Sequence, residues 1–377
     1  MPEQSSHAMN GSSAQITSAI GELCRSEGFS LWGCAALEPT QWEAELRAWI
    51  AAGKHGTMNW LADMIQARLD PNRVLEGARS VVMVADLYAT RQEGHHTTST
   101  LNGKIARYAR GNDYHKVIKK RLARVCDRLR DQIPHAQTRV FCDTAPVLER
   151  EMARLCGLGW IGKHTLLINP KLGSWMLLGG FFTTLEIAPA EKKNLEPDHC
   201  GSCTRCIDAC PTDAITPYSV DARACISYLT IEHRHEIAPA LAEKLDGWMF
   251  GCDICQEVCP HNSPRSKTCI ERPRVREDYA PRRTGFDLLK VLGWDEHARR
   301  KAFQTSALKR AKLAQFKRNA VCVLGGMLDD HETGKTTLSA GQIEDVLAQL
   351  RQVARDVRED ALVRSAADRV LKRSSAG

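Results

Sequence analysis

The sequence has no long apolar run and no apolar segment near its beginning. The longest predominantly apolar stretch without a charged residue, around Ser174 to Leu185, is far shorter than the ~20 apolar residues that cross a bilayer. The first fifteen residues, MPEQSSHAMNGSSAQ, lack the apolar core of a secretory signal. We therefore expect a cytoplasmic protein that is neither exported nor embedded in a membrane.

The composition excludes several other classes of protein. Aromatic residues make up only 6% of the chain, and no residue type is enriched as it is in collagen, coiled coils or disordered proteins. The 377 residues are more than one core of ~150 residues needs. This length favours two or three domains and excludes a small scaffold held together by disulfides.

Cysteine and, in one region, positive charge are abundant. The chain has 15 cysteines, and in the absence of an export signal we expect them to stay reduced, where clustered thiols usually bind metal. Residues 265–318 contain sixteen Lys or Arg against six Asp or Glu. A local excess of this size predicts a polyanionic partner.

The pattern of apolar residues predicts alternating helices and strands in the first half of the chain. The expected helices are 14–28 and 115–133, and the expected strands are 29–37, 79–88, 138–142 and one or two within 173–187. Asp143-Thr-Ala-Pro146 resembles a helix cap followed by proline, which predicts a helix from about Val147.

The string Gly157-Leu-Gly-Trp-Ile-Gly162 matches the dinucleotide-binding pattern letter by letter. We reject that function because the pattern must follow a strand and open a helix, whereas this string follows a predicted helix. We expect instead a loop whose glycines let a large group approach the backbone.

Composition divides the chain into three predicted domains and gives an α+β fold class. Residues 1–189 are expected to form an α+β domain, residues 190–263 a ferredoxin-like cysteine module, and residues 264–377 a basic, all-helical domain that resembles HEAT repeats. The helices expected in the last domain are 285–292, 307–327, 340–351 and 354–373.

Seven cysteines lie in two runs that each end in Cys-Pro. The first run, Cys200-x2-Cys203-x2-Cys206-x3-Cys210-Pro211, has the spacing of bacterial ferredoxins, in which the fourth cysteine binds the other cluster. The second run is Cys252-x2-Cys255-x3-Cys259-Pro260, and its expected first ligand is replaced by Met249, whose thioether is a poor ligand for iron.

These runs predict two [4Fe-4S] clusters and the transfer of single electrons. The first cluster is assigned to Cys200, Cys203, Cys206 and Cys259. The second is assigned to Cys210, Cys252 and Cys255 with one further ligand, for which Cys225 and Cys269 are the nearest candidates. Structural zinc is disfavoured because zinc sites usually have two CxxC pairs without a Cys-Pro ending. The remaining cysteines are expected to be small buried side chains.

Four further segments of the sequence carry long motifs that are typical of one protein family. They are Ile105-Ala-Arg-Tyr-Ala-Arg-Gly-Asn-Asp-Tyr-His115, Asp143-Thr-Ala-Pro-Val-Leu-Glu-Arg150, Gly157-Leu-Gly-Trp-Ile-Gly-Lys-His164 and Cys225-Ile-Ser-Tyr-Leu-Thr-Ile-Glu-His233. With the two cysteine runs, they resemble the epoxyqueuosine reductases, the iron-sulfur and cobalamin enzymes of queuosine biosynthesis in transfer RNA. The resemblance spans roughly Gly53 to Gly325.

The resemblance implies cofactors and their sites. It implies cobalamin held between a nitroreductase-like N-terminal domain and the ferredoxin-like module, base-off and without a protein histidine on cobalt. It also implies that Cys225 is the eighth cluster ligand. The implied contacts to cobalamin are Arg68, His115, Asp143, Lys163, His164, Ser227 and Asp253.

The implied reaction removes the epoxide oxygen of epoxyqueuosine in the anticodon loop, using two electrons and two protons and giving queuosine and water. Asp143 is the implied proton donor, provided that burial keeps its carboxyl group protonated near neutral pH. Ile254, His261 and His235 depart from the usual pattern of the family near the second cluster or the corrin. These departures concern cluster potential and packing, and the implied reaction is unaffected.

Two alternatives have the same cysteine runs. A reductive dehalogenase uses the same cofactors, but it usually carries a twin-arginine export signal, which is missing here. A two-cluster electron-transfer subunit would bind no corrinoid. Bound corrinoid after anaerobic purification distinguishes an enzyme from such a carrier.

The basic region predicts where RNA binds. Residues 307–324 are expected to form a helix whose apolar face packs on the protein. Its other face carries the predicted RNA contacts Lys309, Arg310, Lys312, Lys317 and Arg318, which act together with a basic stripe between Lys116 and Arg128. The expected partners are the anticodon stem-loop of transfer RNA and an unidentified electron donor, and we expect a monomer.

Overall fold

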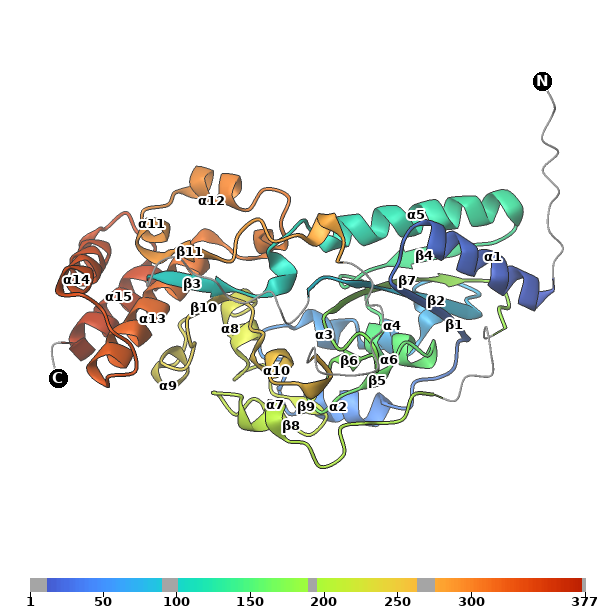
Figure 1. Ribbon diagram of the computed structural model, residues 1–377, viewed down its shortest axis with the longest axis horizontal. Coiled ribbons are helices and arrows are strands. Elements are labelled where there is room, and N and C mark those ends of the chain that lie inside the picture. Colours follow the sequence, from blue (N-terminus) through green and yellow to red (C-terminus); the bar gives the residue numbers. More distant parts are fainter. Residues whose placement is uncertain (1–11, 90–100, 189–194, 263–274, 375–377) are drawn as a thin grey trace, which may run out of the picture.

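A computed structural model describes residues 12–89, 101–188, 195–262 and 275–374. Figure 1 shows an elongated molecule with a sheet at one end and the C-terminal helices at the other. The cysteine-rich segments lie between them along one edge. None of the helices in these ranges has the length and apolar character needed to span a membrane.

A four-stranded antiparallel sheet forms the N-terminal part, with the order β1 (Leu31–Ala36), β2 (Ser80–Leu87), β7 (Met176–Thr183) and β4 (Thr138–Phe141). Every residue of β2 is buried. Val82 and Val84 pack with α1 (Ser13–Ser26) and α5 (Tyr114–Gln132) on one face. Val81 and Met83 pack with α6 (Glu149–Leu155) on the other. The sheet therefore has helices on both faces, as Figure 1 shows.

A smaller sheet joins the three segments that the composition separates. Its order is β10 (Trp248–Phe250), β3 (Asn102–Ile105) and β11 (Gly285–Asp287). The expected helix at 285–292 is thus partly wrong, because its first residues pair with β3 and only α11 (Leu288–Leu292) is helical. Side chains from all three segments share one core, and the domain limits at 189 and 263 remain predictions.

The remaining elements are short in the middle of the chain and long at its end. In chain order they are α2 (Glu43–Ala51), α3 (Trp60–Asp63), α4 (Ile65–Leu69), β5 (Trp160–Ile161), β6 (Leu167–Ile168), α7 (Arg205–Asp208), β8 (Ile215–Thr216), β9 (Ser219–Val220), α8 (Ile226–Ile231), α9 (Pro239–Ala242), α10 (Ile254–Glu257), α12 (Glu296–Ala302), α13 (Leu313–Glu332), α14 (Ala340–Arg355) and α15 (Ala361–Ser374). The 3-10 turns within the described ranges are Pro71–Arg73, Arg107–Ala109, Pro260–Asn262, Glu277–Tyr279 and Ala307–Arg310. The α+β fold class with a helical C-terminal part is confirmed.

The predicted helix at 307–327 is interrupted. Ala307–Arg310 forms a 3-10 turn, the backbone is extended at Ala311 and Lys312, and α13 begins only at Leu313. The basic residues of this region are therefore split between two elements with different orientations. The last expected helix also begins later than predicted, because α14 ends at Arg355 and α15 begins at Ala361.

Candidate functional site

The four cysteines assigned to the first cluster line one pocket. Cys200 and Cys203 lie in the loop before α7, Cys206 lies on α7, and Cys259 follows α10. Burial raises the pKa of the Cys200 thiol, and the main chain of Lys163 and the indole of Trp160 act against this rise. The fold thus brings together the ligand set that the spacing predicts, on segments more than fifty residues apart in sequence.

The cysteines assigned to the second cluster are also neighbours. Burial and then the thiols of Cys225 and Cys210 raise the pKa of the Cys252 thiol. The pKa of Cys255 is raised by burial and by Cys252 and Cys225. Met249 packs against Gly103 in the core. The structure therefore places Cys225 beside the other three, whereas Cys269 lies outside the described residues.

The donor sets fit iron-sulfur clusters. All eight cysteines are free thiols, and they form two groups of four. Thiolates bind such clusters, and the thiol protons are released when the metal binds. The six other described cysteines are buried, as expected for small apolar side chains.

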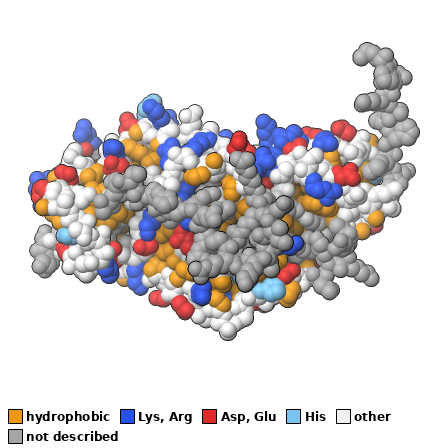
Figure 2. Space-filling model, viewed as in Figure 1, with side chains coloured by type: hydrophobic (Ala, Val, Ile, Leu, Met, Phe, Trp, Pro, Cys, Tyr) orange, Lys and Arg blue, Asp and Glu red, His pale blue; other side chains and the backbone are white. Residues whose placement is uncertain are grey.

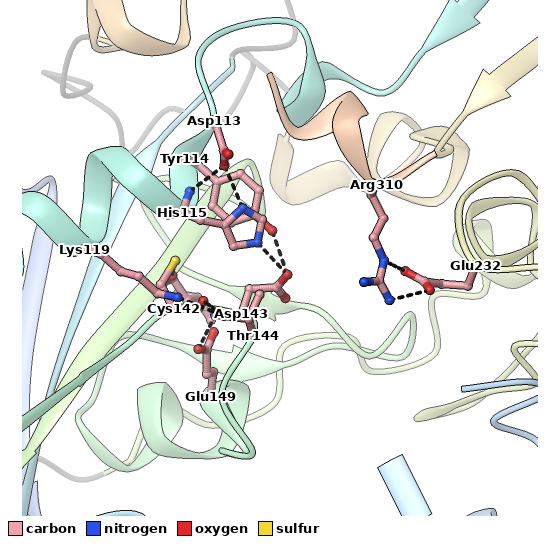
Figure 3. Close-up of polar contacts among 11 residues, drawn as sticks. Asp113, Tyr114, His115, Lys119, Cys142, Asp143, Thr144, Glu149, Glu232 and Arg310 are labelled. Carbon is pink, nitrogen blue, oxygen red and sulfur yellow. Dashed lines mark hydrogen bonds and ion pairs between the residues drawn. The ribbon is translucent and has the colours of Figure 1, made fainter. Parts of the chain in front are cut away.

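Asp143 lies at the centre of a polar group outside the cysteine pockets (Figure 3). It follows β4 with a positive φ of 58°, which is uncommon for a residue other than glycine. Its Oδ2 lies 2.9 Å from His115 Nε2 and accepts a hydrogen bond from Tyr114 Oη at 3.0 Å. The predicted cap role at 143–146 is wrong, because α6 begins at Glu149 and its preceding residue has no side-chain cap.

His115 connects Asp143 to a second carboxylate. Its Nδ1 lies 2.8 Å from Asp113 Oδ1, and Asp113 also caps α5. Burial alone would lower the pKa of His115, but the hydrogen bonds with Asp113 and Asp143 outweigh it and raise the pKa to about 9. The imidazole therefore carries a proton at neutral pH.

Asp143 itself is ionised in this arrangement. Burial favours its neutral form, but the hydrogen bond and the charge of His115 lower its pKa below the usual value. Its side chain is 60% exposed. In this arrangement burial does not by itself keep Asp143 protonated, because incomplete burial is outweighed by the adjacent imidazolium. The proton belongs to the Asp143–His115 pair and lies on the histidine.

Two further side chains complete this site. Glu149 accepts a hydrogen bond from the main-chain N–H of Asp143, and burial followed by the charge of Asp143 raises its pKa to about 8. Arg68 lies within electrostatic reach of both carboxylates. Its buried Nε–H has no hydrogen-bond partner in the described part of the chain, so a polar group of a bound cofactor can accept from it. Sequence reasoning missed Glu149 and Tyr114, although both lie within the family strings.

An ion pair lies on the opposite side of this site. Arg310 donates two hydrogen bonds to Glu232, Nε to Oε1 at 2.8 Å and Nη2 to Oε2 at 2.7 Å. Glu232, and to a smaller extent Asp143, raise the pKa of Arg310. Figure 3 shows the Asp143 group on one side and the Arg310–Glu232 pair on the other. Arg310, predicted to contact RNA, thus lies across from the Asp143 group.

The other predicted cofactor contacts are placed elsewhere. Lys163 Nζ donates to the main-chain oxygens of Gly201 at 2.6 Å and Cys203 at 3.1 Å, and His164 is buried at the first cysteine pocket. Asp253 is 1% exposed and accepts a hydrogen bond from the main-chain N–H of Arg107 at 2.8 Å. Ser227 is partly exposed on α8. The structure therefore groups only Arg68, His115 and Asp143.

The predicted RNA contacts fall into two sets. Lys309, Arg310 and Lys312 are exposed. Lys317 is buried, and its Nζ lies 2.6 Å from Glu359 Oε2. Arg318 is 0% exposed and donates to the main-chain oxygens of Leu229, His233 and His235. The prediction for Lys317 and Arg318 is wrong, because α13 begins at Leu313 and turns these two side chains into the core.

Exposed positive charge also follows α5 and α12. Figure 2 shows Lys and Arg side chains along this edge of the molecule. The stripe on α5 is exposed as expected, but part of it contacts α1: Arg124 pairs with Glu27 at 2.5 Å, and Arg128 donates to Ser26. The half of the stripe nearest to Asp143 carries Lys116 and Lys120.

We expect Arg318→Met to destabilise the protein by about 3 kcal/mol or more. The substitution would leave the buried oxygen of Leu229 and the partly buried oxygens of His233 and His235 without their donor, and the loss of a buried charged partner costs this much. Thermal unfolding of the holoprotein measures the change. Arg358→Met is the control, because the Arg358 side chain is 88% exposed. A normal melting temperature with weaker RNA binding in Arg318→Met would instead indicate that Arg318 contacts RNA.

These features define an oxidoreductase with two iron-sulfur cluster sites beside a separate acid-base site. Two family models match the chain: the 4Fe-4S double cluster binding domain over residues 199–262, and Epoxyqueuosine reductase QueG, DUF1730, over residues 68–144. The epoxyqueuosine reductase of Leadbetterella byssophila is 39% identical over 319 residues, covering 84% of this chain and 99% of that protein. That of Xanthomonas campestris is 37% identical over 349 residues, 92% of each. The chain belongs to the epoxyqueuosine reductase family.

Solved structures share the fold. The epoxyqueuosine reductase from Bacillus subtilis, in a form whose catalytic aspartate loop has swung out of the active site, superimposes with a TM-score of 0.81 at 23% identity, covering 95% of this chain and 90% of that one. An epoxyqueuosine reductase with an epoxyqueuosine-modified tRNA-Tyr stem loop superimposes with a TM-score of 0.78 at 21% identity. The overlap covers 96% of this chain and 99% of that one.

Proposed function

We propose that this chain reduces epoxyqueuosine to queuosine in the anticodon loop of transfer RNA, with electrons passing from two [4Fe-4S] clusters to cobalamin. Membership of the family supports the reaction, and eight cysteines in two groups support the electron path. The observation that carries the proposal is the acid-base group of Asp143, His115 and Arg68, in a chain that also carries both groups of cysteines. The same relationship disfavours a dehalogenase or a carrier subunit.

Arg68 and His115 are the residues of this group that would hold cobalamin, and Ser227 on α8 remains a predicted contact. Bound there, cobalamin would supply a low-potential metal that takes up electrons singly. The chain itself supplies protons. Two electrons and two protons convert the epoxide oxygen to water, and the protonated His115 with its Asp143 partner can deliver the first proton. Glu149, whose pKa is about 8, holds a second proton next to Asp143 at neutral pH.

The substrate base must leave the anticodon stack to reach this site. Such a movement requires contacts to the flanking phosphates, and exposed cations supply them. Lys309, Arg310 and Lys312 are exposed at the edge of the site, and we propose them as these contacts. We also propose that the protein is cytoplasmic and monomeric and that it receives its electrons from a separate donor.

Reconstituted protein tests the reaction directly. Anaerobic protein with both clusters, cobalamin and a chemical reductant should remove one oxygen from a stem-loop that contains epoxyqueuosine, as measured by mass spectrometry. Protein that carries both clusters and binds no corrinoid would instead be an electron carrier. Turnover of halogenated aromatics without turnover of the stem-loop would identify a dehalogenase.

We expect neutralisation of Lys309, Arg310 and Lys312 to weaken stem-loop binding and to make it less dependent on salt. Each phosphate contact contributes about one unit to the slope of log affinity against log salt, so the triple alanine variant should lose up to about two to three units. Filter binding at several salt concentrations measures this slope. Lys335→Ala, on a side chain that is 72% exposed, is the control. An unchanged slope in the triple variant would place the RNA contacts elsewhere.

A further inference from the structure

Two buried N–H donors lie at the first cysteine pocket. Trp160 is 2% exposed and packs with Cys259 and Cys200, and His164 is 3% exposed and lines the pocket. The Trp160 indole lowers the pKa of the Cys200 thiol, but neither Trp160 Nε1 nor His164 Nε2 makes a hydrogen bond of ordinary geometry within the part of the chain that the structure describes. A buried donor without an acceptor costs free energy, so such groups are normally paired. An acceptor that belongs to the bound cofactor resolves both cases.

The hairpin formed by β5 and β6 fixes these two donors. Gly159 has a φ of 153°, and a Cβ there would lie 2.0 Å from the main-chain oxygen of Ile168, so only glycine lets the two strands approach. The string Gly157–Gly162 therefore serves hairpin packing. The Trp160 ring lies edge-on against His199 and His261, each with a centroid distance of 4.8 Å. Its orientation is thus fixed before any cofactor binds.

The tautomer of His164 is set by the main chain. Nδ1 accepts a hydrogen bond from the N–H of Leu166 at 3.2 Å. A nitrogen that accepts carries no proton, so in the neutral ring the proton lies on Nε2. His164 lines the pocket together with Cys200, Cys203, Cys206 and Cys259. Its free N–H is therefore available to a group bound among these cysteines.

Sulfur atoms are the acceptors that this pocket would contain. Each [4Fe-4S] cluster has four inorganic sulfides and four cysteine sulfurs, and hydrogen bonds to them stabilise the more negative, reduced state. We propose that Trp160 Nε1–H and His164 Nε2–H donate hydrogen bonds to sulfurs of the first cluster and raise its reduction potential. The inference rests on the proposed function only in requiring that cluster.

The second cluster has a different environment. The buried carboxyl group of Asp253 lies between Cys252 and Cys255 in sequence, and it pairs with the buried guanidinium of Arg107 at 3.4 Å. The proposed shift in potential therefore concerns the first cluster.

The midpoint potential of each cluster, followed by electron paramagnetic resonance during a redox titration, tests this proposal. Trp160→Phe keeps an aromatic ring and loses the N–H, and His164→Leu loses the other donor. Each variant should lower the potential of one cluster and leave the other unchanged. A tenfold fall in the ratio of reduced to oxidised cluster at a fixed potential corresponds to about 59 mV for a one-electron couple.

Two controls separate hydrogen bonding from packing. His164→Gln retains an N–H donor and should restore part of the shift that His164→Leu causes. His135→Gln changes an exposed histidine outside the pocket, so no shift is expected. Full iron content with unchanged potentials in both Trp160→Phe and His164→Leu would overturn the proposal while leaving the proposed function intact.

A measurement on the unmodified protein tests the proposal even where a variant loses the cluster. With indole-¹⁵N tryptophan incorporated, pulsed electron paramagnetic resonance of the reduced first cluster should show a ¹⁵N coupling through the N–H···S contact. Absence of this coupling would contradict the role of Trp160. Neither measurement uses RNA, so failure of the stem-loop reaction and failure of this inference are separate results.

Discussion

Asp143→Asn should keep both clusters and bind the stem-loop normally, while turnover falls by about 10² or more. The amide cannot carry the negative charge that holds the proton on His115, and the pair loses its acid. The comparison with the unmodified enzyme uses single-turnover reduction of an epoxyqueuosine stem-loop, so product release does not limit the rate. Because the Asp143 side chain is 60% exposed, its replacement should affect stability little.

The pH dependence provides an independent check of this pair. The pKa of His115 in the folded protein, about 9, lies above its ordinary value of 6.5. The stabilisation from the ion pair is therefore complete below about pH 6.5 and is lost as the pH rises through about 9. Turnover should fall over the same alkaline range, and in Asp143→Asn the fall should begin at lower pH. Undiminished turnover of Asp143→Asn would contradict the proposed role of Asp143.

Cys225→Ala should lower the iron content from about eight atoms per chain toward about four and abolish turnover. In the proposed assignment each cluster has its own four thiolates, and Cys225 lies with Cys210 and Cys252. The first cluster, bound by a different set of cysteines, should remain. Iron analysis and the electron paramagnetic resonance signal of the surviving cluster measure this outcome.

Two other cysteines serve as comparisons. Cys322→Ala removes a buried thiol from α13 and should keep about eight iron atoms. Cys269→Ala tests the other ligand that the spacing leaves open, and it should also keep its iron. Loss of iron in Cys269→Ala together with full iron in Cys225→Ala would reverse the assignment of the eighth ligand.

The sequence by itself determined the elements that depend on local patterns. The apolar spacing of α1, α5 and the buried run of β2 is strong enough to place them within about two residues. The Cys-Pro runs likewise specify the cluster sites, because three thiolates at three-residue spacing can reach one cluster without help from the rest of the fold. Family strings then supplied Asp143 and Cys225.

Tertiary structure decided what the long-range contacts control. Lys317 and Arg318 have the composition of an RNA-binding surface, but the break before Leu313 turns them inward, where Glu359 and the carbonyl oxygens around His233 compensate their charge. Long-range pairing also decided β11. Its residues have a pattern that predicts a helix, but in the folded chain they pair with β3. A periodic pattern shows which face is apolar, but it does not show where a helix begins.

The acid-base properties of the site also depended on the fold. Asp143 and His115 lie 28 residues apart, and their contact, together with the hydrogen bond from His115 to Asp113, places the proton on the imidazole. The donors of Trp160 and His164 are likewise ordinary side chains in the sequence, and burial without a partner is what distinguishes them. Chemical identity is local, whereas protonation and hydrogen-bond satisfaction are set by neighbours that only the folded chain brings together.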